Sequence, residues 1–537
     1  MKAVERLRSL LGPPGRGYIP LDPGRTSAVR GGARNPNLTK AVIRLYWLCL
    51  FFGLGTSVWG YNIGILSSIL VHPGWTAIQG DLTPQRKGTI TGVYYLGTWV
   101  SYLFISRPLS DSFGRRRAAM CGTAILCVGA LLQASCAGPA PFLVMVAGRA
   151  ICGVGVAIVS TSVPLYQSEI SPARERGKFV TMNHIGFIVG LAAGLWVGYG
   201  MTFWTGETGN YYGWRISLLL QLIPALAFGF GLPFVPESPR WLVEKGRVGE
   251  AATILHWLRE GSFTHDEVDK EVNDMVDSVD EHRHSGLNWK SLFVEAPLFA
   301  RLWRAALLHF LAQMSGASAM KYYLPTLLKA LGLSTRLALM AGAIEMTLKI
   351  GCSVIEMLII DRLGRRLSLA IGCVAMALGM LINGTLPLIY PGNVNKIADM
   401  ACVLFIFVYA FGYSLGFGPA AWLYGSEIFP TSVRARGLNF SASAGSIGSV
   451  VVAQIWPIGI HAIGSNIYFF FMVVNVLCVP LIYLFYPETK GRSLENMDEL
   501  FGKLEIRRLE DIGSYTGSDA RSSDDAVRRG ARQAGSL

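Results

Sequence analysis

Several titratable side chains interrupt long apolar stretches of this sequence. Lys321 lies in one such stretch, Glu345, Lys349 and Glu356 lie in the next, and His184 stands in a third. A charged group in an apolar segment that crosses lipid normally faces an interior cavity and marks a functional site. The chemistry that these residue types indicate is recognition of an anionic group by ammonium groups, or proton exchange by carboxylates and imidazole.

Each of these residues also has an ordinary structural interpretation. Lys321 is near one end of its apolar run and can extend its ammonium group to water. Glu345 and Lys349 are spaced i, i+4 with the acid first, which is the favoured order for a pair on one helix. Glu356 can pair with an arginine of the following loop, and His184 can be a buried histidine with satisfied hydrogen bonds. Both interpretations stay open at the level of sequence.

Apolar segments dominate the chain. Of its 537 residues, 51% are hydrophobic and only 15% are charged, and the mean hydropathy is +0.40. Soluble domains carry about 25% charged residues, so this composition excludes a soluble protein of this length. Runs of about 20 apolar residues, the length that crosses a ~30 Å hydrocarbon core, recur. They predict an all-α membrane protein with twelve spans, at 42–68, 88–108, 118–137, 141–163, 178–203, 215–235, 303–330, 336–360, 367–389, 399–424, 438–460 and 466–486.

Basic residues concentrate in the short loops after the second, fourth, eighth and tenth spans. Because cytosolic loops carry the excess of lysine and arginine, both termini and the loop 236–302 are predicted to be cytosolic. The first 44 residues hold nine basic and two acidic side chains. We expect this tail to lie against the anionic inner leaflet rather than to bind nucleic acid. The expected partners are the lipid bilayer and a small-molecule substrate, for a monomer in the plasma membrane.

Three motifs occur twice along the chain. DSFGRRR at 111–117 recurs as DRLGRRL at 361–367, EISPARER at 169–176 as EIFPTSVR at 427–434, and PESPR at 236–240 as PETKGR at 487–492. Each copy follows the corresponding span of its half, so the chain is predicted to form two pseudo-symmetric six-helix bundles. The expected domains are a basic tail 1–41, bundles 42–235 and 303–486, a loop 236–302 with short amphipathic helices, and a largely disordered tail 487–537.

The repeated motifs place carboxylates and arginines at helix ends on the cytosolic side. Groups of this kind on different bundles can pair when that side closes and separate when it opens. An exposed pair contributes only ~0–1 kcal/mol, but a few kcal/mol sets the balance between two conformations. Within the motifs, the expected charge partners are Glu169 and Arg176, Glu237 and Arg240, and Glu427 and Arg434. The predicted gating residues are Asp111, Arg115, Arg116, Glu169, Arg176, Glu237, Arg240, Asp361, Arg365, Arg366, Glu427 and Arg434.

The motifs PLYQSEISPARERG, PESPRWL, DRLGRR, GPAAWLYGSEIFPTSVRARG and PETKGRSLE together resemble the sugar porter branch of the major facilitator superfamily, over roughly residues 45 to 500. The resemblance implies transport by alternating access, with a substrate site between the two halves. The stretch WVGYG is similar to filamentous-fungal members, including the group that carries quinate and sugar-like acids. Arg107 departs from the family pattern, which usually has Gly there.

The resemblance also assigns a substrate site, where this chain departs from a hexose carrier. The seventh span reads AQMSGASAMKYY where sugar porters usually read QQxSGxNxxxYY. His184 stands where the family has a sugar-contacting Gln, and Lys349 where many members have Asn. Neutral hexoses are held by amides and aromatic faces, so these changes favour a sugar-like acid. Lys321 is expected either to counter its carboxylate or to sit at the outer gate. The predicted substrate-binding residues are Asn62, His184, Gln313, Ser318, Lys321, Tyr322, Tyr323, Lys349 and Trp422.

Coupling is predicted from the same resemblance. Many proton-driven sugar porters have GYD in the first span, with the aspartate beside an arginine of the fourth. Here the motif is GYN, ending at Asn62, while Arg149 remains. Asn62 cannot release a proton, so the resemblance is to facilitative members. The alternative is proton symport of an acid through Glu345, Glu356 or His184, because a proton offsets the charge of an anion entering a negative cell.

Nothing in the sequence indicates an enzyme, because it shows no metal-ligand spacing, nucleophile constellation or phosphate-binding loop. No cofactor or metal is expected, and the nine cysteines are interpreted as small buried hydrophobic residues. Pro325 is expected to break the seventh helix. Two other functions remain as alternatives: an exporter of a secondary metabolite, and a non-transporting sugar sensor, which the short C-terminal tail disfavours.

Overall fold

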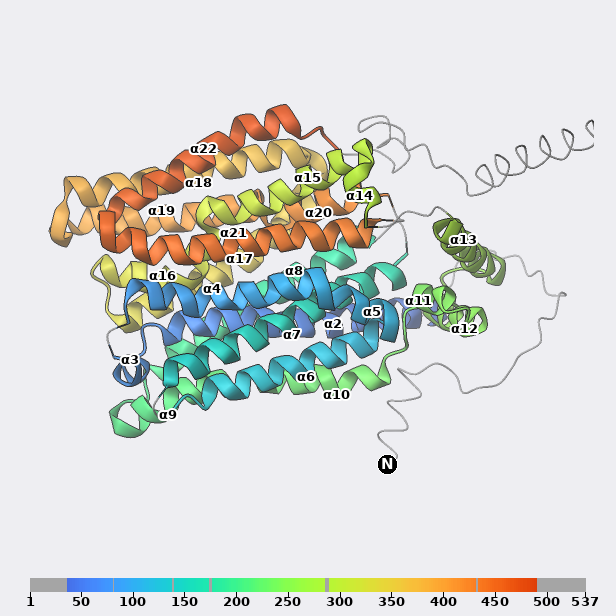
Figure 1. Cartoon of the computed structure of the whole chain (residues 1–537), viewed down its shortest axis with the longest axis horizontal. Coiled ribbons are helices and arrows are strands. Elements are labelled where there is room, and N and C mark those ends of the chain that lie inside the picture. The colour runs from blue at the N-terminus through green and yellow to red at the C-terminus, as the bar shows by residue number, and fades with distance from the viewer. Residues whose placement is uncertain are drawn as a thin grey trace, which may run out of the picture.

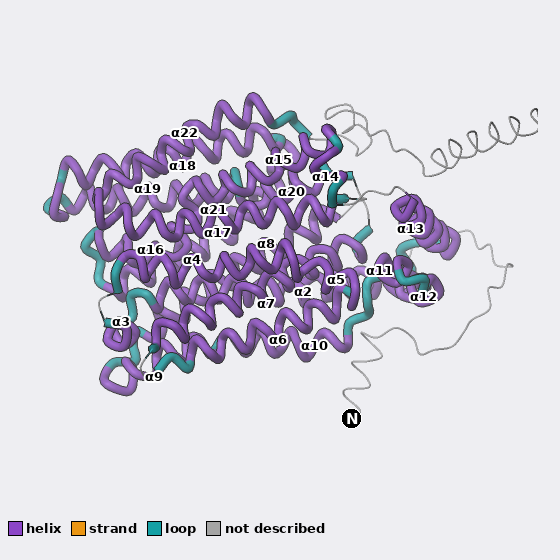
Figure 2. Tube along the Cα trace, in the orientation of Figure 1, coloured by secondary structure: helices purple, strands orange, loops and turns teal. Residues whose placement is uncertain are grey.

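The computed structural model describes residues 36–80, 82–137, 140–172, 176–284, 289–430 and 433–489. Over these ranges the chain forms helices joined by short loops (Figure 2). The predicted N-terminal tail lies mostly outside these ranges, and the predicted C-terminal tail almost wholly so. The predicted all-α class is therefore found, with the helices lying lengthwise in two groups (Figure 1).

The N-terminal half contains six lengthwise segments, and two of them are interrupted. The second segment changes to a π-helix and back, and the sixth breaks into two helices. The segments are α2 (Pro36–Ile69), α4 (Pro84–Val100) continued by η1 (Ser101–Ile105) and α5 (Ser106–Phe113), α6 (Arg115–Ala134), α7 (Pro141–Ile170), α8 (Arg176–Met201), and α9 (Gly206–Leu219) with α10 (Leu222–Gly231).

The C-terminal half also contains six segments. They are α15 (Ala296–Ala312) continued by η3 (Gln313–Ala317) and α16 (Ser318–Ala330), α17 (Thr335–Leu363), α18 (Arg365–Ile389), α19 (Lys396–Leu415) with α20 (Gly418–Ile428), α21 (Arg434–Ile463) and α22 (Ile467–Phe485). Nine helical stretches among the described residues are long and apolar enough to cross a membrane, and one of these covers both α21 and α22. The interrupted segments α4–α5 and α15–α16 complete the twelve predicted spans.

The seventh predicted span is broken, but not at Pro325. The break is at η3, where Gly316 has a φ of +105°, a left-handed conformation that glycine adopts readily because it lacks a Cβ. The carbonyl of Ser315 at this break accepts hydrogen bonds from the Tyr409 hydroxyl at 3.2 Å and the Asn475 amide at 3.0 Å. The following helix continues through Pro325, so the predicted position of the break was wrong. Irregular backbone inside a membrane needs such partners from neighbouring helices.

The two halves meet along three helix pairs, α4 with α21, α8 with α17, and α2 with α16. The connecting segment forms α11 (Pro239–Glu244), α12 (Val248–Arg259), α13 (His265–His284) and α14 (Ser291–Val294). In Figure 1, α11–α13 lie beyond one end of the bundles, which we call the linker end. Helix α3 (Pro73–Gln79) and α9 lie at the opposite end, called the far end.

The linker helix α12 is fastened to the N-terminal half. Its apolar side chains Ile254, Leu255 and Leu258 are buried. The buried Arg259 guanidinium donates a 3.0 Å hydrogen bond to the carbonyl of Ile170, the last residue of α7. Carbonyl groups at a helix C-terminus lack intrahelical donors, so this cation both satisfies the end of α7 and fixes the position of α12.

Candidate functional site

A small pocket lies inside the C-terminal half, between α16, α17 and α19. Its polar lining consists of Lys321, Glu345, Lys349, Tyr409 and Tyr413, and the rest of its wall is apolar. The volume is about 10 Å³, which is room for roughly one water molecule. In this conformation the pocket is therefore closed around its own side chains rather than open to a large solute.

Two ammonium groups converge on one aromatic ring in this pocket. The Nζ atoms of Lys321 and Lys349 each lie 5.0 Å from the centre of the Tyr413 ring, and Lys321 is also 5.9 Å from the Phe187 ring of α8. Lys321 is 8% exposed, so extension of its ammonium group to water is not what the structure shows. Within the described part of the chain, no hydrogen bond to either Nζ is formed. Cation–π contact therefore contributes to the local stabilisation of these charges.

Glu345 does not neutralise Lys349 by a direct ion pair. The two side chains line the same pocket, but no carboxylate–ammonium contact within 4 Å is found between these two described residues. The Glu345 Oε2 atom is buried without a hydrogen-bond partner in the described part of the chain. The i, i+4 spacing thus places the two charges within electrostatic range of each other. The carboxylate and the ammonium group both stay able to hydrogen-bond another group.

His184 and Glu356 lie nearer the linker end, on opposite sides of the contact between α8 and α17. His184 Nε2 and both carboxylate oxygens of Glu356 are buried, with no hydrogen-bond partner among the described residues. Both side chains approach Gly418, the first residue of α20. The structure therefore brings two of the sequence-predicted titratable residues together from different halves.

Asn62 and Arg149 belong to a second cluster, closer to the far end. Arg149 is fully buried and donates to the Asn62 side-chain oxygen at 2.5 Å and to the Tyr322 hydroxyl at 3.1 Å. The Asn62 amide donates to Gln221 at 2.8 Å. Next to this cluster the Tyr323 hydroxyl lies 2.8 Å from the hydroxyl of Thr91. Tyr322 and Tyr323 thus join α16 to the N-terminal half above the pocket.

The remaining predicted binding residues are spread along the interface. The Ser318 hydroxyl donates to the Gln313 side-chain oxygen at 3.0 Å across the break in the seventh segment. Trp422 lies edge-on to His309, with ring centres 4.8 Å apart, and packs against the buried Tyr102. Trp422 is therefore on the linker-end side of the interface, away from the two lysines.

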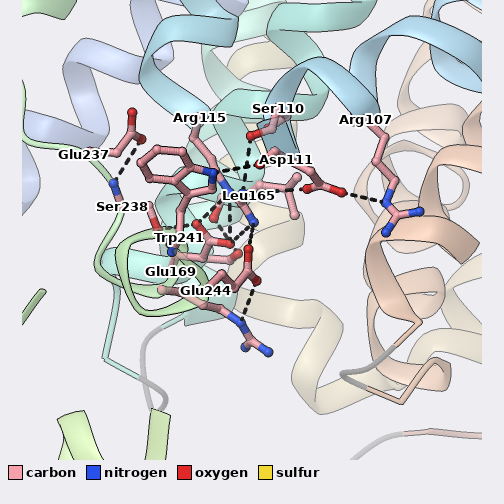
Figure 3. A network of polar contacts seen from close by, with 12 residues as sticks. Arg107, Ser110, Asp111, Arg115, Leu165, Glu169, Glu237, Ser238, Trp241 and Glu244 are labelled. Atoms are coloured by element: carbon pink, nitrogen blue, oxygen red, sulfur yellow. Dashed lines mark hydrogen bonds and ion pairs between the residues drawn. The ribbon is translucent and has the colours of Figure 1, made fainter. Parts of the chain in front are cut away.

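At the linker end of the N-terminal half, Arg115 holds a charge network (Figure 3). Its guanidinium is 2.9 Å from Glu169 of α7, 3.6 Å from Glu244 of α11 and 3.7 Å from Asp111. The Glu169 carboxylate also accepts a hydrogen bond from the Ser238 hydroxyl. Because Arg115 is buried, these contacts act at a lower effective dielectric than pairs in water, and they fix the ends of α5, α6 and α7 together.

Glu237 caps helix α6. Its carboxylate accepts the backbone N–H groups of Arg116 at 3.1 Å and Ser238 at 3.0 Å, and the Arg116 guanidinium donates to the Val235 carbonyl at 2.9 Å. Gly114 precedes the helix with a φ of +95°, and a Cβ there would lie 2.5 Å from the Glu237 carboxylate. Burial raises the pKa of Glu237, although a carboxylate is well placed at a helix N-terminus.

The same arrangement recurs in the C-terminal half. The Arg365 guanidinium donates to Glu427 at 2.7 Å, and Glu427 also accepts from the Thr489 hydroxyl at 2.6 Å. Glu488 accepts the backbone N–H groups of Arg365 and Arg366, both at 3.0 Å. The repeated sequence motifs are thus a repeated structure, in which one glutamate binds the arginine and another caps its helix.

Some partners differ from those that the motifs suggested. Glu169 and Glu427 bind Arg115 and Arg365 of the GRR motifs, which are partners that the motifs did not suggest. Arg240 is 3.9 Å from Glu244, because both lie on α11 one turn apart. Each of these pairs joins parts of the same half. Its contacts therefore stabilise that half and do not by themselves connect the two halves.

Other gating candidates lie at the same end. Arg434 donates to the Phe429 carbonyl at 3.2 Å. Arg107, which replaces the usual glycine, is 3.2 Å from Asp111 (Figure 3). Its guanidinium also lies 5.9 Å from the ring centre of Trp289, which precedes α14. The side chains of Arg176 and Asp361 lie outside the part of the chain that the structure describes. Pairing between halves by these residues stays a prediction.

Several residues of the site were not found from the sequence. Tyr413 and Gly418 come from helices far along the chain from the lysines. No motif marks Tyr413, and Gly418 opens the GPAAWLYGSEIFPTSVRARG motif without a role assigned to it there. Glu488 and Thr489 had a signal, because PETKGR repeats the PESPR motif whose glutamate and serine do the same work in the other half. Aligning the two copies residue by residue would have selected both.

Comparison with known proteins gives the same assignment over most of the chain. The family model described as sugar (and other) transporter matches residues 48–501. The MFS-type transporter oryC of Aspergillus oryzae is 30% identical over 85% of this chain and 85% of its own length. The probable quinate permease of Aspergillus niger is 29% identical over 85% and 88%. A partially occluded inward-open structure of the xylose transporter XylE from E. coli, 23% identical, superimposes with a TM-score of 0.71 over 84% of this chain and 99% of that one. The chain belongs to the sugar transporter family of the major facilitator superfamily, whose members are multi-pass membrane transporters and not enzymes.

Proposed function

We propose that this transporter moves a sugar-like acid of the quinate type across the membrane by alternating access. One observation carries the proposal: the ammonium groups of Lys321 and Lys349 each lie 5.0 Å from the centre of the Tyr413 ring, in one small pocket. Two cations at one ring repel each other. A substrate carboxylate relieves that repulsion and accepts charge-assisted hydrogen bonds from both. The name of the Aspergillus niger relative supports the same substrate class.

The neutral groups around the lysines suit the hydroxyl-bearing ring of such a substrate. Gln313 and Ser318 already exchange a hydrogen bond at the break in the seventh segment. Neutral donors and acceptors of this kind bind hydroxyl groups without the desolvation penalty of a further charge. The lysines then select the acid, while Gln313 and Ser318 read the polyol ring.

The mode of transport has two candidates. The facilitative mode is supported by Asn62, which holds Arg149 through a neutral amide and has no proton to exchange. Proton symport is favoured by one observation elsewhere, the buried Glu356 carboxyl whose oxygens have no partner among the described residues. An inside-negative membrane opposes entry of an anion, so a proton taken up with it would remove that opposition.

We propose that the protein is a monomer in the plasma membrane, with its linker end on the cytosolic side. The arginine–glutamate networks then stand at the inner gate, and Tyr322 and Tyr323 close the outer path by their contacts with Arg149 and Thr91. Alternating access opens one set as the other closes.

Uptake of labelled quinate and glucose by yeast that lacks its own carriers tests the proposed function. Lys321→Met should lower kcat/KM for quinate by roughly 10- to 100-fold, because a hydrogen bond to a charged group contributes about 1.5–3 kcal/mol. Any uptake of a neutral polyol should be unchanged. Lys329→Met is the matched control, because Lys329 is an exposed residue of the same helix.

The alternatives give different results. Glucose uptake without quinate uptake would show that the lysines are structural. Uptake of neither compound, with the protein present at the membrane, would contradict the proposal and favour export of a secondary metabolite or a sensor function.

A further inference from the structure

Two polar side chains from different halves come close to Gly418. A Cβ atom built on Gly418 would lie 3.4 Å from Nε2 of His184 and 3.7 Å from Oε2 of Glu356. His184 belongs to α8 of the N-terminal half, and Glu356 belongs to α17 of the C-terminal half. Because Gly418 has no side chain, both groups lie next to its backbone rather than next to an apolar side chain.

Glu356 is an unusual carboxyl group. The residue is 1% exposed, and neither of its oxygens has a hydrogen-bond partner in the described part of the chain. A carboxylate buried without a partner is unfavourable, whereas a protonated carboxyl can donate a hydrogen bond. The Nε2 atom of His184, on the opposite half, is likewise without a partner among the described residues and lies near the same glycine.

The charged groups around Glu356 connect it to the substrate pocket. Lys349 lies on the same helix, two turns or about 10 Å towards the far end, and Lys321 faces Lys349 over the Tyr413 ring. Glu345 lines the pocket beside the lysines. The other titratable groups in electrostatic range of Glu356 are Tyr413 and Cys352, and His184 lies near the same glycine. With neutral histidine, tyrosine and cysteine, the two lysines and two glutamates carry no net charge.

An anionic substrate would change this balance. Its carboxylate adds a third negative charge to a buried set that holds two positive ones. Glu345 lies beside the lysines, whereas Glu356 is farther along α17. When an anion is bound, the positive charges therefore stabilise the Glu356 carboxylate less than the Glu345 carboxylate. Uptake of one proton by Glu356 restores neutrality.

We infer that Glu356, beside His184 of the other half, is a proton-binding site linked through Lys349 to the binding of an anionic substrate. A proton from the outer solution forms an O–H bond on the Glu356 carboxylate, and the same bond breaks when the proton leaves to the inner solution. The inference rests on the proposed function and deepens its symport candidate. It places coupling at the α8–α17 contact and not at Asn62.

The position of the pair also gives the proton a route out. The two groups come from different halves, so movement of one half against the other separates His184 from Glu356. A buried carboxyl that gains contact with water in this step releases its proton more readily, because water stabilises its charged form. Substrate release and proton release then occur on the same side of the membrane.

Purified protein in liposomes tests the inference. The assays are exchange of labelled quinate, net quinate accumulation driven by an inward proton gradient, and proton entry reported by an internal pH dye. Wild-type protein should accumulate quinate with one proton per molecule. Glu356→Gln should keep exchange within about threefold while accumulation and quinate-dependent proton entry fall at least tenfold. Glu356→Asp should retain part of both.

Three controls separate the outcomes. Glu250→Gln, at an exposed linker site, should retain proton entry, and thermal unfolding of each variant should show that it is folded. An imposed inside-negative potential should slow quinate entry in Glu356→Gln but not in wild type, because only the variant carries the bare anion. His184→Gln should shift the pH at which accumulation is half-maximal, because it changes the polar group of the other half beside Gly418 and Glu356.

The inference is overturned if Glu356→Gln accumulates quinate with wild-type proton entry, or if wild type exchanges quinate without moving protons. In both cases the proposed substrate class would stand. Failure of wild-type protein to exchange quinate at all would overturn the proposed function, and the inference with it.

Discussion

The Arg149 guanidinium donates a 2.5 Å hydrogen bond to the side-chain oxygen of Asn62, and both residues are fully buried. Arg149 also lies 4.3 Å from the centre of the Tyr94 ring and donates to the Tyr322 hydroxyl of the other half. A buried cation is thus held by an amide, a phenol and an aromatic face. This set of partners contains no group that exchanges a proton near neutral pH.

Replacing Asn62 should create such a group. Asn62→Asp puts a carboxyl against Arg149 with little change of shape. In a Glu356→Gln background, where quinate transport is expected not to drive protons, Asn62→Asp should restore pH-dependent uptake. The measurement is the initial rate of quinate entry between pH 5 and 8. Asn62→Ser in the same background is the control, and an unchanged pH profile in Asn62→Asp would remove this position from any role in coupling.

The Tyr413 ring should matter through its face and not its hydroxyl. Tyr413→Phe keeps the ring beneath Lys321 and Lys349, so quinate transport should stay within about twofold of wild type. Tyr413→Leu removes two cation–π contacts, each of about 0.5–2 kcal/mol, and should lower kcat/KM at least fivefold. Kinetics with quinate and with a neutral polyol distinguish the two effects. A similar loss in both variants would show that the hydroxyl group, and not the ring face, supports the site.

The linker-end networks should act on rates more than on binding. Glu427→Gln weakens the 2.7 Å contact with Arg365, far from the lysine pocket. Turnover should fall about tenfold, while the Kd for quinate stays within threefold. Glu250→Gln is a control of the same chemistry, because Glu250 pairs with Arg247 at an exposed linker site, where an ion pair contributes ~0–1 kcal/mol. An equal change in Kd and turnover would place Glu427 in binding rather than gating.

Glu237 should give the folded state a pH dependence of definite sign. Burial raises its pKa above the usual 4.5, so the folded protein keeps a proton there to higher pH than the unfolded chain does. Folding therefore binds a proton in that window, and the free energy of unfolding falls as pH rises through it, until Glu237 is ionised in both states. Thermal unfolding in detergent at a series of pH values from 4.5 to 7 measures the slope.

Glu237→Gln should make the fall of the free energy of unfolding with pH shallower in the acidic range. Near neutral pH the variant should show the same slope as wild type. The variant keeps an acceptor for the N–H groups of Arg116 and Ser238, so it should still fold. Lower stability at every pH with the wild-type slope would mean that hydrogen bonding, and not the buried charge, determines the effect of this residue.

The overall architecture of this protein is readable from the sequence alone. Apolar runs long enough to cross a bilayer must become helices, because backbone groups in lipid have to bond within the chain. The repeated motifs predict two similar halves, and their charges predict which residues gather at one end. The lysines within apolar runs likewise indicate a cavity, because a lone charge cannot face lipid at low free energy.

Which of those groups meet was decided only by tertiary structure. Spacing along a helix tells which residues share a face, but the partner helix and its offset follow from packing between segments hundreds of residues apart. That packing put the Tyr413 ring under both lysines and His184 opposite Glu356 beside Gly418. It also broke the seventh segment at Gly316, where a left-handed residue is tolerated, rather than at Pro325, which the continuing helix accommodates.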